Sequence, residues 1–151
     1  MTKSAKYYAA LEIVDDLHSV LEDVIASNGE SDTILKLAIL DFDDAEAMAA
    51  EKLTPLKNDY QVVVSGKLWV DIMNATTNKK QGVEALQRVL GVTAAQTAVF
   101  GDYLNDLQML SAGQWSFAMG NAHPALKQAA HFVAPSNADH GVLQVVDKLI
   151  A

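Results

Sequence analysis

Cysteine is absent from the 151 residues, so disulfide bonds, thiolate metal sites and cysteine nucleophiles are excluded. Proline and glycine are scarce, with 3 and 8 residues, and half of the chain is hydrophobic, which excludes collagen-like, low-complexity and disordered chains. No uninterrupted apolar run is long enough to cross a membrane, and no apolar segment of signal-peptide length precedes the first acidic residues. We therefore expect a globular cytoplasmic protein.

Basic residues are also few, with 11 Lys and Arg against 19 Asp and Glu, a formal net charge of −8 and a pI of about 4.7. A chain this acidic repels polyanions, so we do not expect nucleic acid as a partner. We also expect no membrane partner, because the sequence has no apolar run of membrane-spanning length. A chain of this length suffices for about one domain with a substantial hydrophobic core.

The first half of the sequence alternates between helical and strand-like apolar spacing, which predicts a small α+β unit with one sheet covered by helices. Turn-forming residues at 28–32 separate the first helix from the first strand. Asp43 or Asp44 is suited to cap the second helix, which we expect Pro55 to end. In chain order, the expected elements are a helix over 8–25, a strand over 34–40, a helix over 45–53 and a hairpin whose strands, 60–64 and 68–73, flank Ser65-Gly66-Lys67.

The polar stretch at 74–78 has no apolar period, and the pattern changes after it. Helices and strands then alternate strictly, which predicts a parallel sheet with helices on both faces and ligands at the carboxyl ends of its strands. The expected elements are helices over 79–90, 104–110, 141–150 and from Pro124, and strands over 97–100, 115–119 and 131–134.

The segment Gly101-Asp102-Tyr103-Leu104-Asn105-Asp106 stands where the first of these strands ends and a helix is expected. Glycine permits a sharp turn out of the sheet, the Asp102 carboxylate suits Mg²⁺, and first-turn amides favour a phosphate. Asp106, one turn later, is placed to orient a neighbour or a metal-bound water. The competing interpretation is a helix start that uses Asn and Asp as caps.

The order of several motifs resembles the C-terminal half of a haloacid dehalogenase (HAD) superfamily phosphatase of the Cof type, subfamily IIB. The motifs are Lys79 at a helix start, the Gly101–Asp106 segment, Met119-Gly120-Asn121-Ala122 and the stretch from Ser136 to Val142. The resemblance covers at least 71–149 and extends more weakly upstream. It implies a partial α/β cap over residues 1–76 and the C-terminal half of a Rossmann-like core over 77–151.

The resemblance implies a role for four residues. Asp102 becomes a Mg²⁺ ligand, and Asn105 makes a polar contact to the phosphate or the metal site. Asp106 belongs to the metal site and holds the motif in place through a contact with Lys79. The Lys79 ammonium neutralises phosphoryl oxygens. The competing interpretation of Lys79 alone is a solvated lysine at a helix start.

One part of the family pattern is missing. The family's nucleophile and its acid/base lie in an N-terminal motif of the form DxDGT, and nothing before Lys79 matches it fully. The nearest string has Asp41 and Asp43 after an apolar strand, but Asp44-Ala45 stands where Gly-Thr is expected. In a second interpretation, Asp41 is the nucleophile, Asp43 the acid/base and Ser65 a phosphate ligand of a complete, capless enzyme. In the other interpretation, residues 41–44 are a strand end and a helix cap inside a cap domain. The hairpin over 60–73 favours this interpretation, because a capless core would need a helix after Ser65-Gly66.

We therefore expect a Mg²⁺-dependent phosphohydrolase of small phosphorylated metabolites, acting through an aspartyl-phosphate, of which this chain carries the lysine and GDxxND motifs. The alternative is a truncated, inactive domain that acts as a structural or interaction module. In the family, the strand before Asp102 pairs with the nucleophile strand. Its edge would then be bare here, so we expect a homodimer or pairing with the missing N-terminal segment.

Overall fold

The computed structural model describes residue 16, residues 22–23, residue 26 and residues 34–151. The helix expected over 8–25 and the turn at 28–32 fall almost entirely outside these residues. The chain divides into two units, residues 1–35 and residues 36–151, and the second contains both sheets that follow. Within the described segments, no helix combines the length and hydropathy of a transmembrane span.

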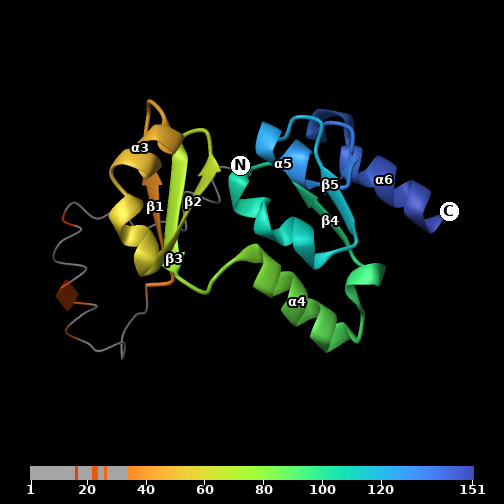
Figure 1. Cartoon of the computed structure of the whole chain (residues 1–151), viewed down its shortest axis with the longest axis horizontal. Helices are drawn as coiled ribbons and strands as arrows, with labels where there is room; N and C mark the ends of the chain where they lie inside the picture. Colours follow the sequence, from red (N-terminus) through yellow and green to blue (C-terminus); the bar gives the residue numbers. More distant parts are fainter. Residues whose placement is uncertain (1–15, 17–21, 24–25, 27–33) are drawn as a thin grey trace, which may run out of the picture. The chain divides into compact units, whose positions relative to one another are not determined.

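The elements of residues 36–151 follow the predicted order closely (Figure 1). The strands are β1 (Lys36–Leu40), β2 (Tyr60–Gly66), β3 (Trp69–Asn74), β4 (Ala98–Gly101), β5 (Trp115–Ala118) and β6 (Phe132–Val133). The α-helices are α3 (Ala45–Glu51), α4 (Lys79–Leu90), α5 (Pro124–Ala129) and α6 (Gly141–Ile150). The 3₁₀ helices are η1 (Thr54–Asn58), η2 (Ala94–Gln96), η3 (Leu104–Asp106), η4 (Gln108–Ala112) and η5 (Asn137–Asp139).

The first sheet is antiparallel, with strand order β1-β3-β2, and contains the expected hairpin. Figure 1 shows α3 lying across one face of this sheet. Alternate strand residues face the helix, and Val64 and Val70 form a buried cluster with Ala45 and Ala49. Asp44 caps α3, because its side chain accepts hydrogen bonds from the backbone N–H groups of residues 46 and 47.

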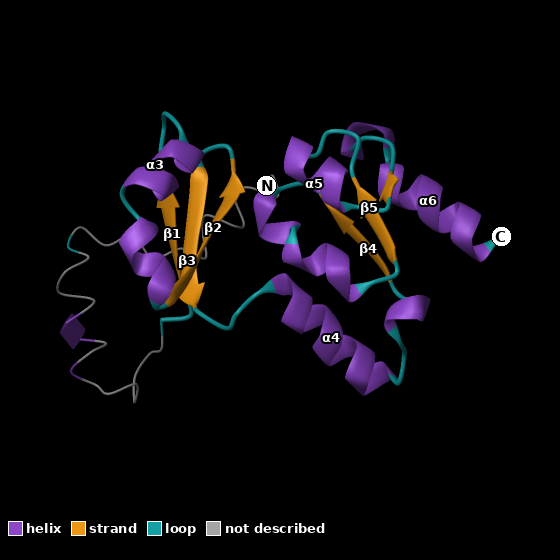
Figure 2. Ribbon diagram, viewed as in Figure 1, coloured by secondary structure: helices purple, strands orange, loops and turns teal. Residues whose placement is uncertain are grey.

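The second sheet is parallel, with strand order β4-β5-β6, as the alternating pattern predicted (Figure 2). Its core contains Val99, Phe117 and Leu126, each less than a tenth exposed. The Phe100 and Phe117 rings stack at 4.9 Å between centroids. β4 lies at the edge of this sheet and pairs only with β5 among the described strands. The carboxyl end of β4 leads directly into residues 102–106.

Two predicted helices differ from the structure. The helix expected over 104–110 is instead the pair of 3₁₀ helices η3 and η4. The backbone of η3 closes tighter turns, because the Asp106 and Leu107 N–H groups donate to carbonyls three residues earlier. Pro55 does not end α3, which stops at Glu51. It occupies the first turn of η1, where its missing N–H costs little.

Candidate active site

The loop after β4 is built around a very close backbone approach. A Cβ atom added to Gly101 would lie 2.7 Å from Cβ of Asp106 and 3.1 Å from Cδ2 of Leu126. Only glycine therefore lets the strand end pass so near the buried Asp106 side chain. The Asp102 backbone N–H then donates to Oδ2 of Asp106 at 3.0 Å. The loop is therefore closed by a hydrogen bond between its first backbone N–H and the Asp106 carboxylate.

Lys79 forms an ion pair with Asp106 through its Oδ1 atom. Lys79 is the first residue of α4, which Asn78 caps by accepting the Gln81 N–H at 3.0 Å. The Asp106 side chain is only 6% exposed, whereas the Lys79 side chain is 51% exposed. Both Asp106 oxygens are thus engaged, and the half-exposed ammonium retains further N–H donors for a ligand.

Asp102 and Asn105 carry the polar groups of the loop that remain available. Asp102 is exposed, and among residues 34–151 no donor reaches its carboxylate. Asn105 is half-buried and lines a cavity of about 370 Å³ together with Lys79. The structure therefore brings Lys79, Asn105 and Asp106 together. Asp102 contacts this group through its backbone N–H, which donates to Asp106.

The cavity also receives side chains from the first sheet. Its other lining residues are Lys36, Gln61, Val63, Asp71, Met73, Thr77 and Asn78. Lys36 Nζ lies 3.3 Å from Oδ2 of Asp71, whose side chain is 11% exposed. None of these lining residues was predicted from the sequence as part of a site. A charged Asp inside the apolar strand Trp69–Asn74 was the available signal, because such a residue needs a partner.

A second polar cluster joins the site loop to α3. The Tyr103 hydroxyl donates to Oε1 of Glu46 at 3.2 Å, and Nε2 of His123 lies 3.4 Å from the same oxygen. Nδ1 of His123 accepts the Ala125 N–H at 3.1 Å, which assigns the ring proton to Nε2. Partial burial, the hydrogen bond to Glu46 and the negative charges of Glu46 and Asp44 raise the pKa of Tyr103.

Asp41, Asp43 and Ser65, the residues of the capless interpretation, belong to the first sheet and its turns. β1 pairs antiparallel with β3 and does not pair with β4, beside which the family resemblance places the nucleophile strand. Oδ1 of Asp41 accepts the Asp43 and Asp44 N–H groups at 2.9 Å each, so this carboxylate closes the turn before α3. The structure thus does not supply the strand pairing that Asp41 would need as a nucleophile.

A divalent cation would find few ligands in the described part of the chain, where no group of three or more His, Asp and Glu side chains converges. Mg²⁺ is commonly held by one or two carboxylates together with waters and substrate phosphate. The exposed Asp102 carboxylate, which receives no hydrogen bond from residues 34–151, suits this type of coordination. Asp106 is poorly suited as a direct ligand, because Lys79 and the Asp102 N–H already engage its oxygens.

Comparison with known proteins gives consistent results. The profile of the haloacid dehalogenase-like hydrolases matches residues 2–146. A 5-amino-6-(5-phospho-D-ribitylamino)uracil phosphatase of Escherichia coli, YbjI, is 34% identical over 99% of this chain and 52% of its own length. A Bacillus subtilis phosphatase of the same description, YwtE, is 32% identical over 80% of this chain and 42% of its own.

Among solved structures, a HAD subclass IIB sugar phosphatase superposes with a TM-score of 0.67 at 21% identity, over 83% of this chain and 45% of its own. The chain thus has part of the fold of the subclass IIB phosphatases. It spans about half the length of the curated relatives that it matches. On the profile match over most of its residues, the chain belongs to the haloacid dehalogenase-like hydrolases.

Proposed function

We propose that this chain carries the lysine and GDxxND part of a Mg²⁺-dependent phosphohydrolase that acts on small phosphorylated metabolites. The observation that carries the proposal is the arrangement of Lys79, Asp106 and Asp102 at the carboxyl end of a parallel strand. Ligands of α/β sheets gather at this end of the strands. The family membership supplies the reaction class.

Each residue has a distinct role in the proposed reaction. Lys79 binds phosphoryl oxygens with the N–H donors that Asp106 leaves available, and Asn105 donates to the phosphate from the cavity wall. Asp106 is a positioning residue, because it fixes both the Lys79 ammonium and the Asp102 backbone. Asp102 would hold Mg²⁺, which when bound neutralises charge on the transferring phosphoryl group.

The attacking carboxylate is not assigned to this chain. The family forms an aspartyl-phosphate on an aspartate of its N-terminal motif, and no segment of these 151 residues matches that motif fully. The proposed division of the chain follows from this, with residues 1–76 as part of a cap and 77–151 as the C-terminal half of the core. A nucleophile-bearing strand would then pair with the edge of β4.

Two relatives are described as phosphatases of a phosphorylated ribityl-aminouracil, so we propose a phosphate monoester of similar size as the substrate class. The missing motif favours a second candidate, a catalytically inactive domain that acts as a structural or interaction module. The two candidates differ in whether the site binds a phosphate group, which is measurable without turnover.

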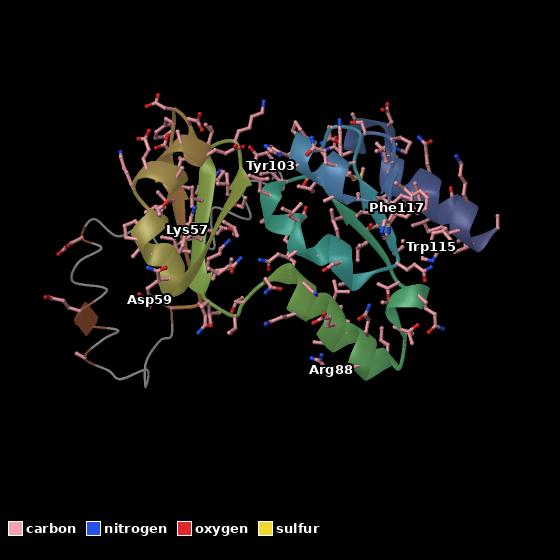
Figure 3. All side chains as sticks on the ribbon, in the orientation of Figure 1. Lys57, Asp59, Arg88, Tyr103, Trp115 and Phe117 are labelled. Atoms are coloured by element: carbon pink, nitrogen blue, oxygen red, sulfur yellow. The ribbon has the colours of Figure 1, made fainter. Side chains whose placement is uncertain are left out.

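The test is binding of inorganic phosphate to the purified chain with and without Mg²⁺, followed by amide NMR shifts and calorimetry. We expect Mg²⁺-dependent phosphate binding that shifts the amides of residues 102–106, and that Asp102→Asn and Lys79→Met each abolish. Asp59→Asn, at the exposed end of η1 (Figure 3), is the matched charge control and retains binding. Absence of phosphate binding in the unsubstituted chain would favour the inactive module.

A parallel assay measures hydrolysis of p-nitrophenyl phosphate with Mg²⁺. We expect no turnover by this chain alone, because no residue in it is assigned as nucleophile. Turnover that disappears in both Asp41→Asn and Asp102→Asn would instead make Asp41 the nucleophile of a complete enzyme, against the antiparallel pairing of β1.

A further inference from the structure

The loop that carries Asp102 and Asn105 is held from the first sheet as well as from the second. Tyr103 and Leu104 pack against the buried cluster between α3 and the first sheet, and Leu104 also packs against the core of the parallel sheet. These two residues separate Asp102 from Asn105 along the chain. The packing of Tyr103 and Leu104 therefore sets where the site side chains on either side of them lie.

Glu46 makes the polar contacts at this junction. Its Oε1 atom accepts the hydroxyl of Tyr103 (Figure 3) at 3.2 Å and lies 3.4 Å from Nε2 of His123. The backbone N–H of His123 donates to the Asp102 carbonyl at 2.9 Å, and its ring meets the Tyr103 ring edge-on at 5.6 Å between centroids. One carboxylate oxygen is thus joined to Asp102 by two routes, through the next residue of the chain and through the donor to the Asp102 carbonyl.

Glu46 projects from a helix that is itself well fixed. Ala45 and Ala49 of α3 are at most 4% exposed, and Asp44 caps the helix by accepting the Glu46 backbone N–H at 3.0 Å. The Glu46 side chain is 45% exposed, so it adds little to the buried cluster. What its carboxylate contributes is the pair of contacts with Tyr103 and His123.

We propose that Glu46 is a positioning residue, which through Tyr103 and His123 holds Asp102 in the conformation that binds Mg²⁺. The inference rests on the proposed function, in which the Asp102 carboxylate is the metal ligand. This carboxylate is exposed and receives no hydrogen bond from residues 34–151. Its position therefore depends on how firmly the backbone of residues 102 and 103 is held.

Two simpler roles of Glu46 predict different results. A negative charge near the site would attract Mg²⁺ without any contact, and its replacement by alanine or by glutamine would then weaken binding equally. A contact that only stabilises the fold would lower the free energy of unfolding but leave the Mg²⁺ affinity of the folded chain unchanged. A positioning role requires the acceptor oxygen, which glutamine retains and alanine removes.

The experiment measures, on the full chain, the Mg²⁺ concentration at which binding of inorganic phosphate is half-maximal, by calorimetry and amide NMR. We expect Glu46→Ala to raise this concentration about tenfold, the lower end of the usual loss when a partner of a metal ligand is removed. Glu46→Gln should stay within about twofold of the unsubstituted chain, because its Oε1 atom still accepts the Tyr103 hydroxyl. Without Mg²⁺, Glu46→Ala should shift the amides of residues 102 and 103 far more than Glu46→Gln does.

Glu51→Ala, at the other end of α3, is the matched control. It removes the same charge from the same helix, and among residues 34–151 no hydrogen bond or ion pair engages the Glu51 carboxylate, so the Mg²⁺ requirement should not change. Tyr103→Phe keeps the ring but removes the hydroxyl, and should raise the requirement by a smaller factor because His123 still contacts Glu46. Added to Glu46→Ala, it should weaken binding no further.

Urea unfolding establishes that each variant is folded. If the unsubstituted chain binds phosphate with Mg²⁺ but folded Glu46→Ala requires no more Mg²⁺, or Glu46→Gln is as impaired as Glu46→Ala, the inference is wrong and the proposed function stands. If Glu46→Ala does not fold, Tyr103→Phe decides, and an unchanged Mg²⁺ requirement in that variant overturns the inference. If the unsubstituted chain binds no phosphate at any Mg²⁺ concentration, both proposals are overturned.

Discussion

At the scale of single residues, Gly101 sets the geometry of the candidate site. A methyl group at this position would lie 2.7 Å from Cβ of Asp106, a distance that the loop cannot accommodate without moving. We predict that Gly101→Ala destabilises the fold by about 1–3 kcal/mol, the usual cost of overpacking. It should also separate Asp106 from the Asp102 N–H. Chemical denaturation and the amide shift of residue 102 measure the two effects.

Gly82 provides the matched control. It lies in α4, and a Cβ atom added there meets nothing within 4 Å. Gly82→Ala should therefore raise stability by about 0.5–1 kcal/mol through helix propensity. Equal effects of the two substitutions would contradict the close approach at Gly101.

Ionisation of the Tyr103 hydroxyl makes the free energy of unfolding depend on pH in the alkaline range. Its pKa is raised in the folded chain by partial burial and by the neighbouring Glu46 carboxylate, so the unfolded chain loses this proton first as the pH rises. The contribution of Tyr103 is complete below the usual tyrosine pKa of about 10 and is lost above it. We predict that the stability advantage of the unsubstituted chain over Tyr103→Phe shrinks between neutral pH and about pH 11.

Unfolding by urea at several pH values measures this difference. Tyr60→Phe, at the half-exposed start of β2, is the control for general alkaline effects. A stability difference between Tyr103→Phe and the unsubstituted chain that stays constant with pH would show that the Glu46 contact has no effect on ionisation.

The place of Asp102 and Asp106 after a strand, and the family resemblance for Lys79 and Asn105, predicted the four residues of the candidate site. The sequence did not distinguish Asp102 from Asp106 by environment, since burial depends on packing against residues far along the chain. Glu46 and His123 were not associated with the loop for the same reason. They approach Tyr103 from positions 57 residues before and 20 residues after it.

At the scale of elements, the start of α4 positions Lys79. Asn78 caps this helix through the Gln81 N–H, and Gly91 ends it in the left-handed conformation with φ of 67°. We predict that Asn78→Ala lowers stability by about 1 kcal/mol, whereas Asn78→Ser retains most of it. Denaturation of the two variants tests this. Equal losses would show that the cap does not depend on a side-chain acceptor.

Both ends of α4 were predicted correctly, and the structure shows a local stop signal at its end, Gly91. The 3₁₀ structure of residues 104–112 was not predicted, because the spacing of their apolar residues fits an α-helix as well as it fits 3₁₀ turns. Tertiary contacts hold both ends of this segment. Asp106 is bound to Lys79, and Gly113 lies so close to the Thr97 carbonyl that a Cβ atom would be 2.7 Å from that oxygen. These constraints fix a tighter 3₁₀ path that local propensity does not encode.

At the scale of the whole molecule, β4 has one open edge among the described strands, and the chain spans about half the length of its curated relatives. The Thr97 and Gly101 carbonyls accept hydrogen bonds from residues of the β5 side. Because backbone groups alternate in direction along a strand, those of Ala98 and Phe100 point to the open edge. Such an edge is a template for pairing with another chain.

We predict that the purified chain self-associates through this edge, with a concentration-dependent mass in sedimentation at micromolar concentrations. Ala98→Pro should abolish association, because it removes an edge N–H that takes no part in the β5 ladder. The residue before it, Thr97, has the extended φ of −116° and ψ of 127° that a following proline requires.

Leu143→Ala is the control for apolar contact through α6, where this side chain is 62% exposed, and should leave association unchanged. A folded Ala98→Pro variant that still associates would place the contact elsewhere, and its loss in Leu143→Ala would place it at α6. A chain that stays monomeric at these concentrations would show that the edge of β4 does not pair with a second copy. Of the two partners expected for this edge, only the segment that bears the nucleophile would then remain.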